Sequence, residues 1–130
     1  MTSKEPTKAP LPRGVIIDAN VLFIPFQFGV NLTESLRELL GEGVEIIVPS
    51  SVIDELERLP GEDWRKRAAL KLARRFRIVR TDGKGDRAIL ELAKRLKLPV
   101  VTQDKELKKR LKAEGIKVIT LRERSYFVFI

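Results

Sequence analysis

Four acidic side chains stand at positions where they could act together. Asp18 directly follows the apolar run at residues 15–17, and Asp104 follows a second apolar run. Glu55 and Asp86 each lie near the start of a helical pattern. The chain contains no histidine and no cysteine, so imidazole bases, thiolates and soft metal ligands are all excluded. Because carboxylate oxygens are the ligands that hard divalent cations prefer, the pattern predicts a carboxylate-only metal site.

Short apolar runs alternate with helical patterns along the chain, which predicts an α/β sandwich around a parallel sheet. The runs that read as strands are residues 15–17, 44–48, 77–80, 99–102 and 117–121. The helical patterns begin after Thr33, after Pro49, at Trp64, near Asp86 and before Leu107. The helix after Pro49 is expected to begin with a capping box formed by Ser51 and Asp54. The apolar run at residues 126–130 is compatible with an extra edge strand or a contact surface.

The expected sheet would bring the acids to one edge. Ligands of open parallel sheets bind outside the carboxyl ends of the strands, which is where Asp18 and Asp104 are placed. Asp86 precedes Ile89 by three residues and so shares the apolar face of its helix. Glu55 follows Val52 by three residues and precedes Leu56, so it lies beside the apolar face of its own helix. Acids in first helical turns also occur for capping and dipole reasons, so any one of the four taken alone has a structural explanation.

The composition describes a small basic domain of 130 residues. We expect a flexible leader at residues 1–13 and one domain at residues 14–130. The 26 Lys and Arg outnumber the 18 Asp and Glu, which gives a net charge of +8 and favours a polyanionic partner. The absence of cysteine is compatible with the cytoplasm, and the high charged fraction resembles that of proteins from hot environments. No apolar run is long enough to predict a membrane span.

Four short motifs together resemble the PIN-domain nucleases over about residues 15–121. VIIDANVL is similar to the family's first motif and carries Asp18, and PSSVIDEL is similar to the second and carries Glu55. GKGDRAILELA resembles the third motif with Asp86, and VVTQD resembles the fourth with Asp104. Archaeal members are the most similar, including VapC-type toxins and ribosome-biogenesis PIN proteins. One departure is Arg87, where many relatives carry an acidic or small residue.

The resemblance implies a three-layer α/β/α sandwich with a mainly parallel sheet of four to five strands. It also implies Mg²⁺- or Mn²⁺-dependent endonucleolytic cleavage of RNA in RNA processing, RNA turnover or toxin action. We expect Asp18 and Asp104 to hold the metal, with Asp86 and Glu55 completing its first or second shell. Five further residues are expected to contact the ligands or the substrate: Asn20, Thr102, Lys105, Lys108 and Lys109. A homodimer and an antitoxin or ribosome-assembly partner are further expectations.

Three alternatives stay open at the level of sequence. Asp18 after a strand resembles the nucleophile turn of haloacid-dehalogenase-like phosphatases, but Asn20 stands where those enzymes need a second aspartate. A receiver-like phospho-acceptor domain would have no use for Glu55. A PIN-like scaffold that binds RNA or a ribosome-assembly partner without cleaving it is the non-catalytic alternative.

Overall fold

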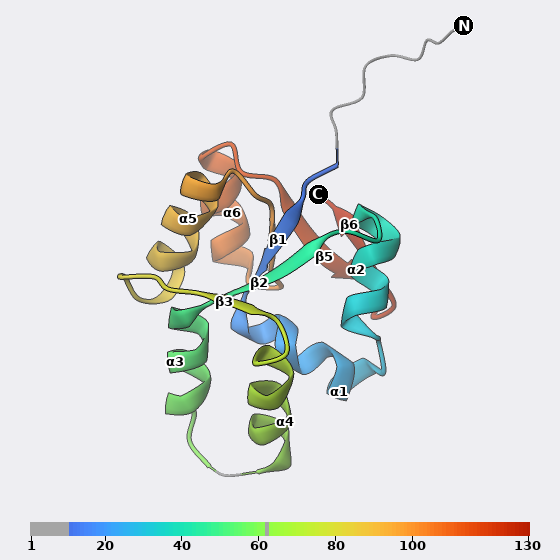
Figure 1. The fold of residues 1–130 in the computed structure, drawn as a ribbon, viewed down its shortest axis with the longest axis vertical. Coiled ribbons are helices and arrows are strands. Elements are labelled where there is room, and N and C mark those ends of the chain that lie inside the picture. The colour runs from blue at the N-terminus through green and yellow to red at the C-terminus, as the bar shows by residue number, and fades with distance from the viewer. Residues whose placement is uncertain (1–10, 62) are drawn as a thin grey trace, which may run out of the picture.

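A single six-stranded sheet organises the computed structural model, which describes residues 11–61 and 63–130 (Figure 1). The strand order is β3-β2-β1-β4-β5-β6. The first five strands in the chain run parallel, and β6 pairs with β5 in the antiparallel direction. The strands are β1 (Gly14–Ile17), β2 (Glu45–Pro49), β3 (Arg77–Val79), β4 (Val100–Val101), β5 (Val118–Arg122) and β6 (Tyr126–Phe129).

The central strand β1 owes its position to its side chains. Val15, Ile16 and Ile17 are completely buried, as expected of a parallel strand that helices cover on both faces. Ile16 lies opposite Ile47 of β2 on one side and opposite Val100 of β4 on the other. The carboxyl ends of β1 and β4 therefore meet at one edge of the sheet, and the segments that follow them begin side by side.

Helices cover both faces of the sheet. Crossovers between parallel strands are right-handed, and the strand order reverses direction after β3, so α5 and α6 lie on the face opposite to α1 and α2. Figure 1 shows these two pairs on opposite sides of the strands. The helices are the 3-10 helix η1 (Ala19–Phe23), α1 (Ile24–Phe28), α2 (Leu32–Leu40), α3 (Ser50–Arg58), α4 (Trp64–Ala73), α5 (Gly85–Leu96) and α6 (Lys105–Ala113).

The structure confirms the predicted fold class and adds detail to it. All five predicted strands are present, and the run at residues 126–130 contributes β6, so the sheet has one strand more than the four to five expected. The helices η1 and α1 had no counterpart in the sequence prediction. Helix α4 begins at Trp64 as predicted and ends at Ala73, because residues 74–76 form a turn that leads into β3.

The predicted capping box at the start of α3 is wrong. The N-cap of α3 is Pro49, which has no side chain that could cap, and Ser51 lies inside the first turn. Ser50 instead bonds across the sheet edge to Thr81, whose backbone N–H donates to the Ser50 Oγ at 2.9 Å. The start of α3 is thus held by the end of β3 rather than by its own side chains.

Two further sequence expectations concern the chain ends and the membrane. Residues 1–10 of the expected leader lie outside the described residues, and β1 begins at Gly14. None of the helices in the described part of the chain combines the length and apolar character that a bilayer crossing requires.

Candidate active site

Asp18 is a buried carboxylate held in one orientation by its neighbours. It follows β1 directly, caps η1 and is only 6 % exposed. Its Oδ1 accepts from the Ala19 N–H at 2.8 Å, while its Oδ2 accepts from the Asn20 side-chain amide at 3.1 Å. Burial raises the pKa of Asp18, hydrogen bonds from Thr102 and the Ala19 N–H oppose the rise, and the charges of Asp86 and Asp104 add to it. A buried carboxylate that structure alone does not require is a typical feature of a functional site.

Thr102 connects Asp18 to Asp104 across 84 residues of sequence. The fully buried Thr102 hydroxyl donates to the Asp18 Oδ2 at 2.7 Å, and the same oxygen accepts from the Asp104 N–H at 3.0 Å. Asp104 is the N-cap of α6, where its Oδ1 accepts from the Leu107 N–H at 2.9 Å. Its second carboxylate oxygen has no hydrogen bond within the described residues and is available to a ligand.

Glu55 and Asp86 approach the same edge from two helices. Burial raises the pKa of Glu55, and the negative charges of Asp18 and Asp86 raise it further. The pKa of Asp86 is raised by burial and by the charge of Asp104, and is lowered by Arg110, whose guanidinium lies 3.8 Å from the Asp86 Oδ2. These mutual effects indicate that the four acids lie within electrostatic range of one another, and their role as metal ligands stays a prediction.

The donor groups at this edge suit a hard divalent cation. They are carboxylate, hydroxyl and amide oxygens, which Mg²⁺ and Mn²⁺ prefer over nitrogen or sulfur. Within residues 11–61 and 63–130, however, no three acidic side chains are arranged closely enough to hold a metal ion together. Because the four negative charges repel one another, closer approach of the carboxylates would need a positive charge between them.

The buried polar residues of the described chain all belong to this region. They are Asp18, Ser51, Thr102 and Thr120, each at or near the carboxyl end of a strand or at the helix start that follows it. The Ser51 Oγ is buried without a hydrogen-bond partner in the described part of the chain. Buried polar groups are costly unless they are paired, so their concentration at one edge distinguishes that edge from the rest of the core.

Gln103 is a residue of the site region that sequence reasoning missed. Its Oε1 accepts from the Thr120 hydroxyl and from the Leu121 N–H, both at 2.8 Å, and its own N–H donates to Asn20 Oδ1 at 3.2 Å. Gln103 thus ties the ends of β1, β4 and β5 together beside Asp104. Its position between Thr102 and Asp104 was the one feature of the sequence that could have indicated a role in the site.

The three predicted substrate lysines of α6 have different surroundings. Lys109 is exposed and lies 4.0 Å from Glu106 on its own helix. Lys108 is partly buried, and burial together with the positive charges of Lys105 and Arg122 lowers its pKa. Lys105 and Lys108 therefore form a basic cluster with Arg122, which the sequence had not associated with them.

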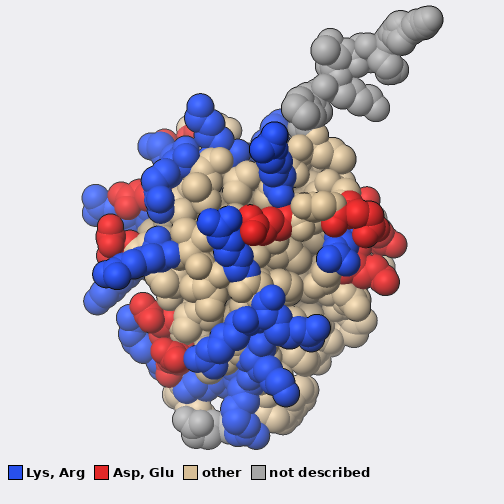
Figure 2. Space-filling view, in the orientation of Figure 1, with Lys and Arg blue, Asp and Glu red and all other residues tan. Residues whose placement is uncertain are grey.

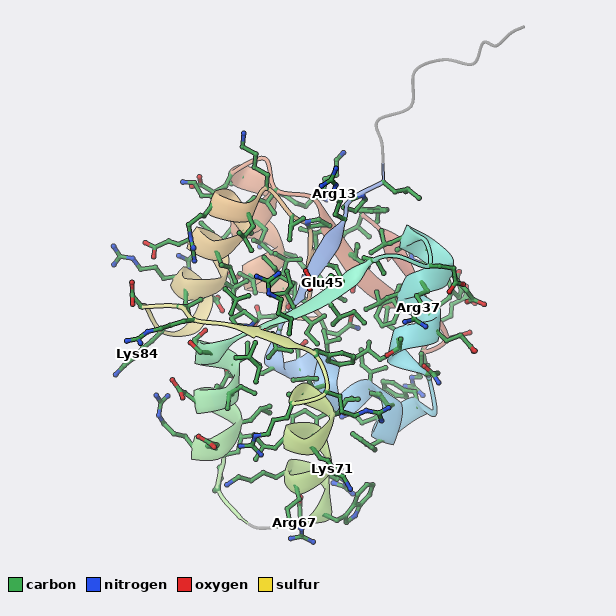
Figure 3. The ribbon with its side chains drawn as sticks, viewed as in Figure 1. Arg13, Arg37, Glu45, Arg67, Lys71 and Lys84 are labelled. Carbon is green, nitrogen blue, oxygen red and sulfur yellow. The ribbon has the colours of Figure 1, made fainter. Side chains whose placement is uncertain are left out.

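Many other cations on this surface serve structural contacts. Figure 2 shows Lys and Arg side chains gathered over α4 and β3. Arg74 pairs with Glu57 and Arg77 pairs with Glu45, each at 3.1 Å. Figure 3 shows Arg67 and Lys71 on α4 far from Lys84, which lies near the start of α5. Part of this basic group is thus neutralised by acids of the same surface.

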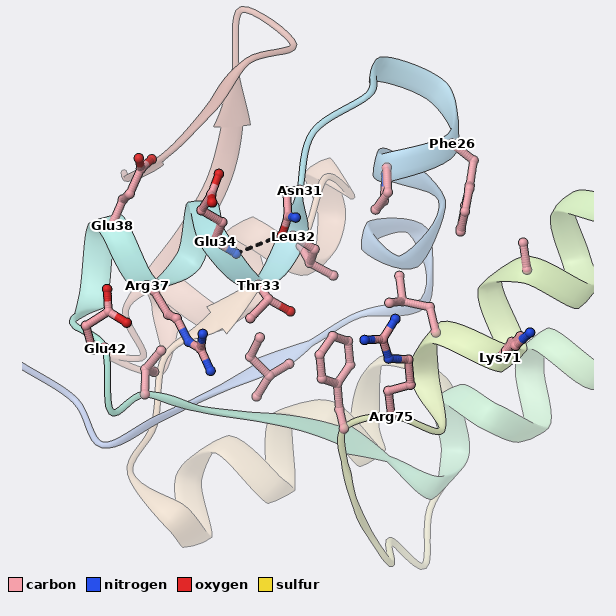
Figure 4. Close-up of a pocket in the computed structure, with 16 residues that line it drawn as sticks. Phe26, Asn31, Leu32, Thr33, Glu34, Arg37, Glu38, Glu42, Lys71 and Arg75 are labelled. Atoms are coloured by element: carbon pink, nitrogen blue, oxygen red, sulfur yellow. Dashed lines mark hydrogen bonds between the residues drawn. The ribbon is translucent and has the colours of Figure 1, made fainter.

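A groove of about 1030 Å³ lies away from the acids, between α2 and α4 and against β2 (Figure 4). Its lining includes apolar side chains such as Val44, Ile46 and Phe76. Its charged residues have both signs, for example Glu38 and Arg75. The groove lacks the uniform positive charge expected of a polyanion track.

Comparisons with known proteins agree with this fold. The family model described as a PIN like domain matches residues 15–124. Ribonuclease VapC9 of Archaeoglobus fulgidus is 34 % identical over 116 residues, which cover 85 % of this chain and 84 % of the relative. Ribonuclease VapC4 of Methanocaldococcus jannaschii is 32 % identical over 122 residues, which cover 87 % of this chain and 93 % of the relative.

Two solved structures share the architecture. The PIN domain endonuclease Utp24 superposes with a TM-score of 0.77 at 29 % identity and covers 89 % of this chain and 90 % of its own. A domain of a functionally unknown protein from Methanocaldococcus jannaschii has a TM-score of 0.63 at 19 % identity, with 85 % and 92 % coverage. The fold and the four-acid edge define an α/β protein of the PIN class. The chain belongs to the PIN like domain family, as its sequence motifs led us to expect.

Proposed function

We propose that this protein is a divalent-metal-dependent endoribonuclease that hydrolyses phosphodiester bonds in single-stranded RNA. The observation that carries the proposal is the buried Asp18, joined to Asp104 through the Thr102 hydroxyl at the edge where Glu55 and Asp86 add their charges. Two relatives named as ribonucleases and a structural neighbour described as an endonuclease support the same reaction class.

Asp18 and Asp104 are the proposed metal ligands, and Glu55 and Asp86 complete the first or second shell. When bound, Mg²⁺ or Mn²⁺ would supply positive charge to the scissile phosphate and favour ionisation of the attacking water. Thr102 and Asn20 have a positioning role, because both donate to the Asp18 Oδ2, and the Thr102 hydrogen bond opposes the pKa rise that burial causes. An ionised, oriented Asp18 is the form that binds a cation.

The decisive experiment is cleavage of a fluorescent RNA in the presence of Mn²⁺ or Mg²⁺. Wild type is compared with Asp18→Asn and Asp104→Asn, and with Asp54→Asn as a control that removes an exposed acid from α3. We expect cleavage by wild type and Asp54→Asn, and no cleavage above the blank by the two site variants. Equal cleavage by all four preparations would identify a contaminating nuclease and refute the proposal.

The biological context consists of further predictions. We expect a cytoplasmic protein that acts in RNA processing, in RNA turnover or as a toxin with an antitoxin partner. Growth arrest on expression would support toxin action. A solution mass from light scattering would test the expected homodimer. If wild type binds RNA but does not cleave it with either metal, the non-catalytic scaffold is the correct description.

A further inference from the structure

Arg122 reaches the acidic edge from a strand that the four-acid pattern does not include. It is the last residue of β5, and β1, β4 and β5 are consecutive parallel neighbours in the sheet. Their carboxyl ends carry Asp18, Asp104 and Arg122 respectively. Because neighbouring strands are about 5 Å apart, these three residues occupy successive positions along one edge.

Hydrogen bonds fix the backbone before Arg122 relative to Asp104. The Gln103 Oε1 accepts from the Thr120 hydroxyl and the Leu121 N–H, both at 2.8 Å. Side chains two apart on a strand point to the same face of the sheet, so Arg122 extends on the face where Thr120 meets Gln103. Strand alternation thus places Arg122 on the face of Gln103, and its charge acts on Lys108 of α6.

Two lysines of α6 complete a cluster of like charge. Lys105 follows Asp104 directly, and Lys108 lies one turn later, where its N–H donates to the Asp104 carbonyl at 3.0 Å. The charges of Lys105 and Arg122 both act on Lys108. Asp104 partly offsets these charges at Lys108, and a bound anion would reduce the remaining repulsion among the three cations.

The ion pairs of α6 do not involve the residues of this cluster. Lys109 pairs with Glu106 and Arg110 pairs with Asp86. Lys105, Lys108 and Arg122 take part in none of the ion pairs found between described residues. The cluster can therefore accept an outside anion without breaking an ion pair, whereas Lys109 has an acidic neighbour 4.0 Å away on its own helix.

We propose that Lys105, Lys108 and Arg122 form a subsite for an RNA phosphate on the Asp104 side of the carboxylates, with Lys109 outside it. This inference rests on the proposed endoribonuclease function and names the residues that place the RNA backbone beside the site. A subsite at this end would hold a phosphate that neighbours the scissile one.

Binding is measured in EDTA by fluorescence anisotropy with a single-stranded oligouridylate, so that cleavage does not interfere. The variants are Lys108→Gln and Arg122→Gln. Lys109→Gln is the control for both because it removes one positive charge, and it is matched to Lys108→Gln because both residues are on α6. We expect each subsite variant to weaken binding several-fold and to reduce the slope of log affinity against log salt by about 0.7, the value for one phosphate contact to a single strand. Lys109→Gln should change both quantities much less.

Equal effects of Arg122→Gln and Lys109→Gln would show that net charge alone matters and would overturn the subsite. Unchanged affinity in both subsite variants would overturn it as well. Arg122→Lys keeps the charge and should recover most of the binding, and thermal melts confirm that each variant is folded. In the cleavage assay we expect KM to rise several-fold with kcat retained. If wild type never cleaves RNA, the nuclease proposal fails while the binding comparison still decides the subsite.

Discussion

At the scale of single residues, the Thr102 hydroxyl opposes the effect of burial on the pKa of Asp18. Burial raises the pKa of Asp18, and the Thr102 hydroxyl is the main group that lowers it again. The hydroxyl belongs to a fully buried side chain and also accepts from the Asp104 N–H. One small side chain therefore bonds both the Asp18 carboxylate and the Asp104 backbone.

Thr102→Val tests this role with almost no change in side-chain volume. Loss of the donor should raise the pKa of Asp18 further, so the acidic limb of the pH–rate profile moves to higher pH if ionised Asp18 is required. We expect kcat/KM to fall by about 10–100-fold, as for other residues that orient metal ligands. Thr102→Ser retains the hydroxyl and should keep the wild-type profile. An unshifted profile in Thr102→Val would contradict the assignment.

At the scale of elements, the site depends on how strand ends are joined. Gln103 connects the segment after β4 to β5 and to Asn20 beside β1 through three hydrogen bonds. Thr120 and Leu121 are buried, so their polar groups have no easy access to water if the Gln103 side chain is lost. The strand ends should therefore lose rigidity when this side chain is removed.

Gln103→Ala is expected to lower the free energy of unfolding by about 1–3 kcal/mol, the cost of leaving buried polar groups unpaired. Gln27 on α1 is exposed, so Gln27→Ala should stay within about 0.5 kcal/mol of wild type. Urea denaturation of the three proteins measures both values. A Gln103→Ala protein as stable as Gln27→Ala would show that water replaces the lost acceptor.

Helix α3 supplies a second prediction at this scale. Burial and the charges of Asp18 and Asp86 raise the pKa of Glu55, so the folded state holds that proton more tightly than the unfolded state. Stability is then lost as the pH rises from the ordinary value of 4.5 through the raised one. Glu55→Gln removes this loss and should melt a few degrees higher than wild type at neutral pH, with no difference in acid below the ordinary pKa. If wild type and Glu55→Gln melt at the same temperature at both pH values, the charges of the other acids do not act on Glu55.

At the scale of the whole molecule, charge is divided between distinct regions. The carboxyl edge of the sheet collects four acids and, beside them, the Lys105, Lys108 and Arg122 cluster. The groove between α2 and α4 combines apolar lining with charges of both signs. The net charge of +8 is thus not spread evenly, and the edge rather than the groove has the chemistry for cleaving a polyanion.

Divalent metal should stabilise the entire fold, because a ligand that binds only the native state raises stability. Mn²⁺ at a hundred times its Kd should add about 2.7 kcal/mol to the free energy of unfolding. Thermal melts with and without Mn²⁺ measure this stabilisation. Each of the single variants Asp18→Asn and Asp104→Asn should reduce or abolish it. A wild-type melt that does not move in saturating Mn²⁺ would count against the carboxylate metal site.

Much of this architecture was predictable from local sequence patterns. The buried run at residues 15–17 and the helical spacing of Ile89 and Ala93 report short-range periodicity, so strands, helices and the alternation between them could be read directly. The 3-10 helix and α1 could not be predicted, because residues 23–28, which include Pro25 and three Phe, show no clear period. Residue types alone also limited the chemistry to oxygen ligands.

Only the tertiary structure decided which side chains meet. The contact between Asp18 and Thr102 spans 84 residues and exists because β1 lies beside β4 in the sheet. The hydrogen bonds of Gln103 to β5 depend in the same way on β5 lying next to β4. So does the effect of the Arg122 charge on Lys108. Strand order is a property of the whole fold, since it is set by how helices and sheet pack together, and no local pattern encodes it. The sequence by itself determined the chemical groups, and packing determined their neighbours.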